Sequence, residues 1–214
     1  MRIVVLVSGS GSNLQAVIDA AKSGELDVDI AAVGADREGT YGIERSAEAG
    51  LETFVVNFNS FPTRAEWDAA LTEKVASYSP DVVVSSGFMR IVSPEFIDAF
   101  NGKYLNTHPA LLPAFPGAHG VRDAMAYGVK VTGCTVHWAD AGVDTGPIIA
   151  QEAVAIEPGD TEESLHERIK VVERRLLVRT LAELAADAPN PAASPNPAAT
   201  PNPARSPNPA GSPN

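Results

Sequence analysis

The hydrophobic and polar positions at the start of the chain form two alternating patterns, short apolar runs and longer amphipathic segments. The apolar runs predict buried strands over residues 3–7, 28–33, 53–56 and 82–85. Apolar residues at helical spacing predict a helix closed by Gly24 and further helices over residues 41–49, 63–78 and 94–100. This alternation predicts an α/β fold, with a doubly wound, mostly parallel sheet and a Rossmann-like N-terminal half.

The pattern changes beyond residue 100, where the expected strands are separated by turn-rich loops. A short strand is expected to end near Asn106 and to run into a loop stiffened by prolines. A helix is expected over residues 119–127. Two strands, over residues 131–138 and 148–156, should then flank a second turn-rich loop.

The C-terminal part divides into a last helix and a repetitive tail. The helix has an apolar stripe from Leu165 to Leu184, and Asp160 with Glu163 is predicted to cap it. From residue 188 a six-residue Pro-Asn-Pro repeat begins, which lacks large apolar side chains and cannot bury a core. We therefore expect one domain over residues 1–187 and a low-complexity, disordered tail over residues 188–214.

The composition restricts the classes of function. The 214 residues have a net charge of −11, which argues against broad nucleic-acid or membrane binding but allows a local site for one phosphate. The only cysteine, Cys134, cannot form an internal disulfide, so a reducing cytoplasm is expected. We expect neither a signal peptide nor a membrane span, because no apolar run is long enough.

Candidate catalytic residues lie at the end of the expected strand near Asn106. Asn106 and His108 are two positions apart, so an extended chain places both side chains on one face. Asp144 lies in the second turn-rich loop, and a carboxylate brought near His108 would favour the protonated imidazole. An amide, an imidazolium and a carboxylate suit a reaction at a carbonyl carbon. The alternative is that Asn106 caps a turn and His108 is a buried core residue.

A glycine-rich turn, Ser8 to Asn13, follows the first strand and opens a helix, as in sites where backbone amides bind an anion. A dinucleotide-binding fingerprint would require glycine at position 14, which is Leu14, and Asp36 is a weak candidate for its acidic residue. The Gly-Lys-Ser/Thr of a P-loop is absent. A single phosphate is the better match, and a turn needed only for packing is the alternative.

Several sequence blocks together resemble a known family. They are Ser8–Ala16, Pro80–Val84, Gly87–Ile91, Asn106–Pro113 and Asp144–Ile149. Over roughly residues 1 to 185, the chain resembles the folate-dependent phosphoribosylglycinamide formyltransferases. The resemblance implies transfer of a formyl group from the co-substrate 10-formyltetrahydrofolate to the amine of glycinamide ribonucleotide, yielding formylglycinamide ribonucleotide and tetrahydrofolate. It also implies a cytoplasmic enzyme of purine biosynthesis that needs no metal.

The resemblance also implies roles for individual residues. Asn106 and His108 would stabilise the oxyanion, with His108 as general acid and Asp144 assisting proton transfer. The ribonucleotide phosphate would be held by Gly11, Ser12 and Asn13, and the ribose hydroxyls by Glu173, although spacing alone places Glu173 toward solvent. Folate contacts are implied for Arg64, Met89, Arg90, Ile91, Val92 and Asn106.

Alternatives remain open at this stage. A formyltetrahydrofolate hydrolase would have a domain before the first strand, and a methionyl-tRNA formyltransferase would have a folded C-terminal domain, so both match poorly. A nonenzymatic phosphometabolite-binding module would keep only the glycine-rich turn. His119 and His137 could join His108 and Asp144 around a metal, but their spacing is unlike a ligand set. We expect His137 either to contact the catalytic residues from behind or to pack in its strand, and His119 to begin a helix or edge the pocket. A homodimer is left open.

Overall fold

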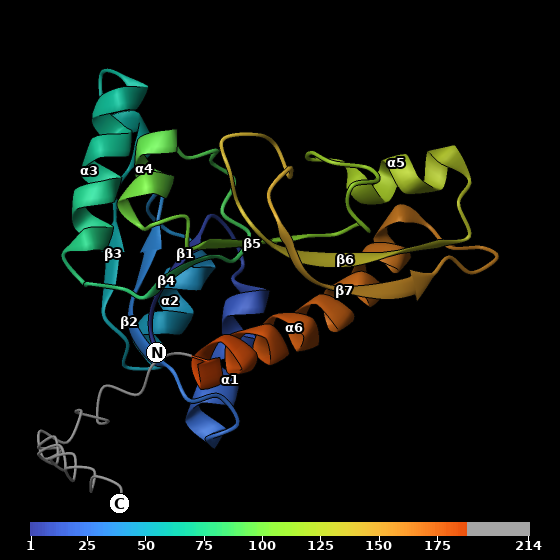
Figure 1. Cartoon of the computed structure of the whole chain (residues 1–214), viewed down its shortest axis with the longest axis horizontal. Coiled ribbons are helices and arrows are strands. Elements are labelled where there is room, and N and C mark those ends of the chain that lie inside the picture. The colour runs from blue at the N-terminus through green and yellow to red at the C-terminus, as the bar shows by residue number, and fades with distance from the viewer. Residues whose placement is uncertain (188–214) are drawn as a thin grey trace, which may run out of the picture.

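The computed structural model describes residues 1–187 and shows a single seven-stranded sheet between helices (Figure 1). The strands are β1 (Arg2–Val7), β2 (Asp29–Ala35), β3 (Thr53–Val55), β4 (Val82–Ser85), β5 (Tyr104–His108), β6 (Val131–Trp138) and β7 (Ile148–Ala155). The helices are α1 (Ser12–Ser23), α2 (Tyr41–Glu48), α3 (Arg64–Ala76), α4 (Pro94–Ala99), α5 (Gly120–Tyr127) and α6 (Glu162–Asp187), with a short 3₁₀ helix η1 (Phe58–Ser60). The predicted α/β fold is confirmed.

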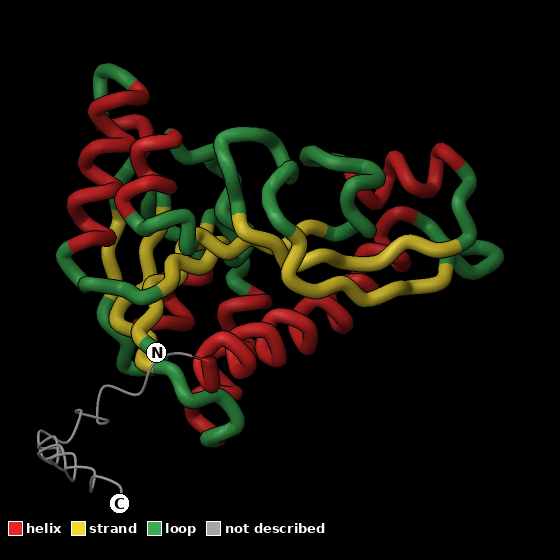
Figure 2. Tube along the Cα trace, in the orientation of Figure 1, coloured by secondary structure: helices red, strands yellow, loops and turns green. Residues whose placement is uncertain are grey.

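The sheet changes from parallel to antiparallel pairing at β5. Its strand order is β3-β2-β1-β4-β5-β6-β7, and every pairing from β3 to β5 is parallel. β5 pairs antiparallel with β6, and β6 pairs antiparallel with β7. The turn-rich loop with Asp144 therefore connects the two strands of a hairpin. Figure 2 shows this long loop rising from the sheet between its two strands.

Both faces of the sheet are buried, which explains why the first strand is continuously apolar. Ile3, Val5 and Val7 of β1 pack in the hydrophobic cluster that includes residues of α1 and α6. Val4 and Leu6 point to the opposite face, into the cluster with α3 and α4. Figure 1 shows α1 and α6 on one side of the sheet and α3 and α4 on the other. This packing fixes the strand ends from which the polar loops emerge.

Two boundary predictions were wrong. β5 extends to His108 rather than ending near Asn106, because the backbone pairing with β6 continues to that residue. The cap of α6 is formed by Thr161 and Ser164, whose hydroxyls accept hydrogen bonds from each other's backbone N–H at 3.1 and 2.9 Å. Asp160 instead accepts from the N–H of Glu157 at 2.7 Å and pairs with Arg168. The tail predicted over residues 188–214 lies outside the described residues.

None of the helices within residues 1–187 is both long and apolar enough to cross a bilayer.

Candidate active site

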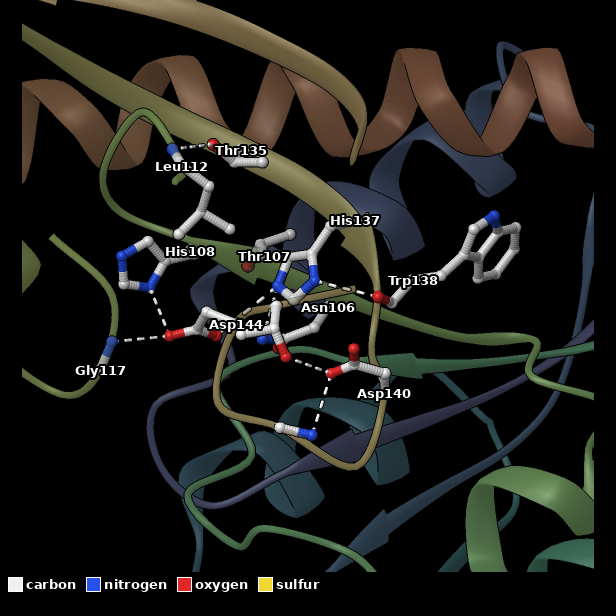
Figure 3. A network of polar contacts seen from close by, with 12 residues as sticks. Asn106, Thr107, His108, Leu112, Gly117, Thr135, His137, Trp138, Asp140 and Asp144 are labelled. Atoms are coloured by element: carbon white, nitrogen blue, oxygen red, sulfur yellow. Dashed lines mark hydrogen bonds and ion pairs between the residues drawn. The ribbon is translucent and has the colours of Figure 1, made fainter. Parts of the chain in front are cut away.

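The predicted catalytic residues meet at the end of β5 (Figure 3). Asn106 and His108 project from the same face of β5, as their spacing predicts, and the β6–β7 loop brings Asp144 against them. Asp144 Oδ2 lies 3.3 Å from Nδ1 of His108. His108 is 4% exposed, so water screens this pair only weakly. The structure therefore brings together an amide, an imidazole and a carboxylate from segments far apart in sequence.

Both ring nitrogens of His108 face hydrogen-bond acceptors. Nε2 lies 2.8 Å from the backbone carbonyl oxygen of Phe115, and Nδ1 faces the Asp144 carboxylate. A carbonyl and an ionised carboxylate can only accept, so the ring satisfies both contacts when each nitrogen carries a proton. The imidazolium form of His108 can therefore donate to both acceptors, and it is the form that can act as an acid.

Asp144 is held in its ionised form by its neighbours. The pKa of Asp144 is lowered from its ordinary value, first by hydrogen bonding with His137; burial opposes this, and the Gly117 N–H and the charge of His108 add to it. Gly117 donates its backbone N–H to Oδ2 at 2.8 Å. The loop is stabilised by Asp140, which accepts hydrogen bonds from Gly142 N–H at 3.0 Å and from Thr145 Oγ at 2.7 Å. The carboxylate is therefore preorganised next to His108.

His137 belongs to the same cluster, so the first of its two expected roles, contact with the catalytic residues, is confirmed. It lies directly opposite Asn106 in the antiparallel β5–β6 pair and is almost fully buried. Its Nδ1 donates to the carbonyl of Trp138 at 3.1 Å, and its Nε2 lies 3.3 Å from Asn106 Nδ2 and 3.6 Å from Asp144 Oδ1. His137 therefore contacts both Asn106 and Asp144. The pairing register of β5 with β6 is the signal that identifies which catalytic residue His137 contacts.

A second polar cluster joins the start of α1 to α6. Glu173 Oε1 accepts hydrogen bonds from Asn13 Nδ2 at 2.9 Å and from the hydroxyl of Thr107. Glu173 is 7% exposed, so the expectation from spacing that it faces solvent was wrong. Its burial follows from the packing of α6 against α1 and the sheet. Thr107 lies between the two catalytic candidates along β5, and its side chain points to the opposite face of the sheet, so the two clusters lie on opposite sides of that strand.

The glycine-rich turn presents backbone donors at the start of α1. Gly11 is the residue before the helix and adopts φ 65°, a conformation that glycine accepts without strain. Because Gly11 has no side chain to cap the helix, the first N–H groups, those of Ser12 and Asn13, are available to an anion. A Cβ at Gly11 would lie 2.9 Å from the Gly42 Cα, so this glycine is also needed for packing. The packing interpretation of the turn is therefore confirmed, and phosphate binding stays a prediction.

The predicted folate-contacting segment follows β4 as an irregular loop. Met89 is 77% exposed and Ile91 59% exposed, whereas Val92 is buried in the core. Large exposed apolar side chains beside a polar site are available to cover a bound aromatic ligand. Arg90 turns inward and donates to Asp36 at 2.7 Å. Arg64 begins α3, is exposed and contacts Asp68 at 3.3 Å.

α5 begins beside the catalytic cluster. His119 precedes its first residue, as one of the two expectations for it stated, and Gly120 packs on the imidazole of His108. A Cβ at Gly120 would lie 3.0 Å from His108 Nε2, so the absence of a side chain leaves room for that ring. Across residues 1–187, no group of three or more His, Cys, Asp or Glu side chains is arranged to hold a metal ion.

Comparisons with known proteins agree on one family. A family model described as formyl transferase matches residues 1–181. The phosphoribosylglycinamide formyltransferase of Mycobacterium tuberculosis (strain CDC 1551 / Oshkosh) is 58% identical over 184 residues, covering 86% of this chain and 85% of that protein. The Escherichia coli (strain K12) protein of the same name is 40% identical over 176 residues, covering 82% and 83%. The crystal structure of glycinamide ribonucleotide transformylase 1 from Symbiobacterium toebii superposes with a TM-score of 0.85 at 45% identity, covering 87% of this chain and 88% of that one.

Proposed function

The chain belongs to the formyl transferase family, and on that premise we propose that it transfers a formyl group from 10-formyltetrahydrofolate to the amine of glycinamide ribonucleotide. The products are formylglycinamide ribonucleotide and tetrahydrofolate, so the enzyme acts in purine biosynthesis. The reaction is assigned to residues 1–187 and to the cytoplasm, where a single unpaired cysteine is compatible with a reducing environment.

One observation carries the proposal, the convergence of Asn106, His108 and Asp144 at the end of β5. A formyl transfer needs a donor for the developing oxyanion and a group that moves a proton between two nitrogens. The Asn106 amide and the His108 imidazolium are hydrogen-bond donors, and the Asp144 carboxylate lies against the imidazole ring. No protein nucleophile is required, because the ribonucleotide supplies its own amine.

The reaction begins when the unprotonated amine of the ribonucleotide attacks the formyl carbon. A C–N bond forms, and the carbonyl electron pair moves onto the oxygen, where Asn106 and His108 stabilise the negative charge. His108 Nε2 contacts the Phe115 carbonyl in this structure. A substrate oxygen would replace that carbonyl as the acceptor. The bond to the folate nitrogen then breaks. The proton lost by the attacking amine passes to that nitrogen with the help of His108 and Asp144.

The second polar cluster is assigned to the ribonucleotide. The N–H groups of Gly11, Ser12 and Asn13 would hold its phosphate, and Glu173 would accept from the ribose hydroxyls, since its ionised carboxylate can accept several hydrogen bonds. The connection through Thr107 supports this assignment, because the same strand, β5, carries Thr107 on one face and Asn106 and His108 on the other. The folate would lie on the other side, against residues 89–92 and Arg64, with Asn106 reaching its formyl group.

Turnover tests the proposal. The purified protein is mixed with 10-formyltetrahydrofolate and glycinamide ribonucleotide, and the folate absorbance is followed with the ribonucleotide omitted as control. We expect the absorbance change only when both substrates are present. Release of formate without the ribonucleotide would indicate a hydrolase, and the absence of any change with folded protein would contradict formyl transfer.

A further inference from the structure

Asp36 is a buried acidic residue to which the proposed reaction assigns no role. It directly follows the last residue of β2, Ala35, and its side chain is completely inaccessible to solvent. The sequence presented it only as a weak candidate for binding a dinucleotide ribose. An ionised carboxylate in such a place needs compensating positive charge. The role of Asp36 therefore depends on the positively charged residues that it contacts.

Two arginines from different loops compensate the charge of Asp36. Arg90, in the loop after β4, donates to Oδ2 at 2.7 Å, and Arg37 Nε lies 3.6 Å from Oδ1. Oδ1 has no hydrogen-bond partner within residues 1–187, so the stronger interaction is with Arg90. The Arg90 guanidinium also lies over the Phe58 ring, 4.0 Å from its centroid. Phe58 in turn donates its N–H to the Asp36 carbonyl at 2.9 Å.

The same arginines and the end of β1 connect the two predicted substrate loops. Arg37 donates to the carbonyl of Ser8 through Nη2 at 2.6 Å and through Nε at 3.1 Å. Ser8 begins the glycine-rich turn, and its hydroxyl accepts from the N–H of Met89 at 2.9 Å. Ser8 also donates its N–H to the Gly87 carbonyl at 3.3 Å. A continuous polar network thus runs from the phosphate turn to the folate loop.

We propose that Asp36 is a positioning residue that couples the two substrate-binding loops, so that binding of one substrate favours binding of the other. This inference rests on the proposed function of those loops. Ordering of the loop at residues 89–92 by the folate holds Arg90 on Asp36, and Asp36 with Arg37 holds the Ser8 backbone at the start of the phosphate turn. Coupling between binding sites is reciprocal, so the same network acts in both directions.

Binding measurements with a nonreactive pair test the coupling. Tetrahydrofolate has no formyl group to donate, so its effect on the dissociation constant of glycinamide ribonucleotide can be measured by calorimetry without turnover. We expect tetrahydrofolate to tighten ribonucleotide binding at least about fivefold in the wild type, the lower end of typical coupling. In Asp36→Asn, which keeps the size and removes the charge, the factor should fall toward one.

Asp160→Asn is the matched control, because Asp160 is also a largely buried aspartate paired with an arginine, but it lies before α6 and takes no part in the Asp36 network. It should keep the wild-type coupling factor. If Asp36→Asn does not fold, Ser8→Ala removes the hydroxyl that accepts from Met89 and leaves Asp36 in place, and its coupling factor should also decrease. An unchanged factor in a folded Asp36→Asn or Ser8→Ala protein would overturn the coupling while leaving the proposed reaction intact. A wild type that binds neither compound would overturn both.

Discussion

Replacement of Asp144 by asparagine tests the proposed proton transfer most directly. Asp144 adopts φ 55°, a left-handed conformation that asparagine tolerates about as well as aspartate. The side chain keeps its size, and its oxygen can still accept the hydrogen bond from Gly117. The substitution therefore removes the negative charge beside His108 with little strain in the loop.

The size of the effect follows from the distance between Asp144 and His108. At the observed 3.3 Å, two unit charges in an effective dielectric of about 20 attract by about 5 kcal/mol, which is a ceiling for the loss. Hydrogen bonding by the new amide recovers part of it. A loss of about 2.7 kcal/mol corresponds to roughly 10²-fold in kcat, the usual scale of general acid–base assistance. The KM values should change little, because the charge acts mainly in the transition state.

The assay is steady-state turnover with both substrates varied, for Asp144→Asn, His108→Asn and the double variant. His108→Asn should be at least as damaging as Asp144→Asn. The double variant should be far less impaired than the product of the two single effects, since the pair acts as one unit. A near-normal kcat in Asp144→Asn would refute the reasoning and reduce Asp144 to a residue that stabilises its loop.

The ionisation of Asp144 also predicts a pH dependence of stability. Hydrogen bonding with His137 and Gly117 lowers its pKa from the ordinary 3.8 in the folded state. The carboxylate therefore stabilises the fold above that ordinary value, and the contribution is lost as the pH falls through the lower folded-state value. The difference in free energy of unfolding between wild type and Asp144→Asn, from denaturant titrations, should be larger above pH 3.8 than in strong acid. A difference that grows on acidification would contradict this sign.

Three further substitutions or truncations have distinct expected results. Gly120→Ala places a Cβ 3.0 Å from His108 Nε2, so kcat should fall about tenfold by displacement of the ring, while the melting temperature stays or rises because alanine favours a helix. An unchanged kcat would mean that the ring has room to move. Glu173→Gln should raise KM for the ribonucleotide about tenfold through the loss of charge-assisted hydrogen bonds, without a change in the folate KM. Equal effects on both substrates would argue against a ribose contact. Truncation after Asp187 should leave turnover and melting temperature unchanged, since the repeat lacks apolar residues to pack; a drop of several degrees would show that it docks on the domain.

The sequence predicted those features that depend on local pattern. The continuous apolar run at residues 3–7 implied a strand buried on both faces, and the packing of alternate β1 residues into two clusters confirms it. The spacing of Asn106 and His108 likewise implied a common face. Each of these predictions needed only the period of one element.

The contacts that the local pattern did not specify mostly join different elements. His137 contacts Asn106 because the pairing of β5 with β6 places the two residues opposite each other. The alternation of residues within β6 alone does not predict that pairing. Glu173 is buried because α1 and β5 contact it. The spacing of apolar residues along α6 does not predict those contacts. The cap at Asp160 and Glu163 was wrong for a local reason, because Thr161 and Ser164 offered a competing reciprocal pair.

The hydrogen bond between Asn13 and Glu173 has a consequence for biosynthesis. It joins residues 160 positions apart, so the helix that carries Asn13 leaves the ribosome long before its partner is made. At roughly 5–20 residues per second, this delay is on the order of 10–30 seconds. β1 likewise waits for β4 before it gains its second neighbour in the sheet. The nascent chain therefore holds an incomplete sheet with uncovered strand edges for most of its synthesis, and this is the interval in which chaperones have the most to protect.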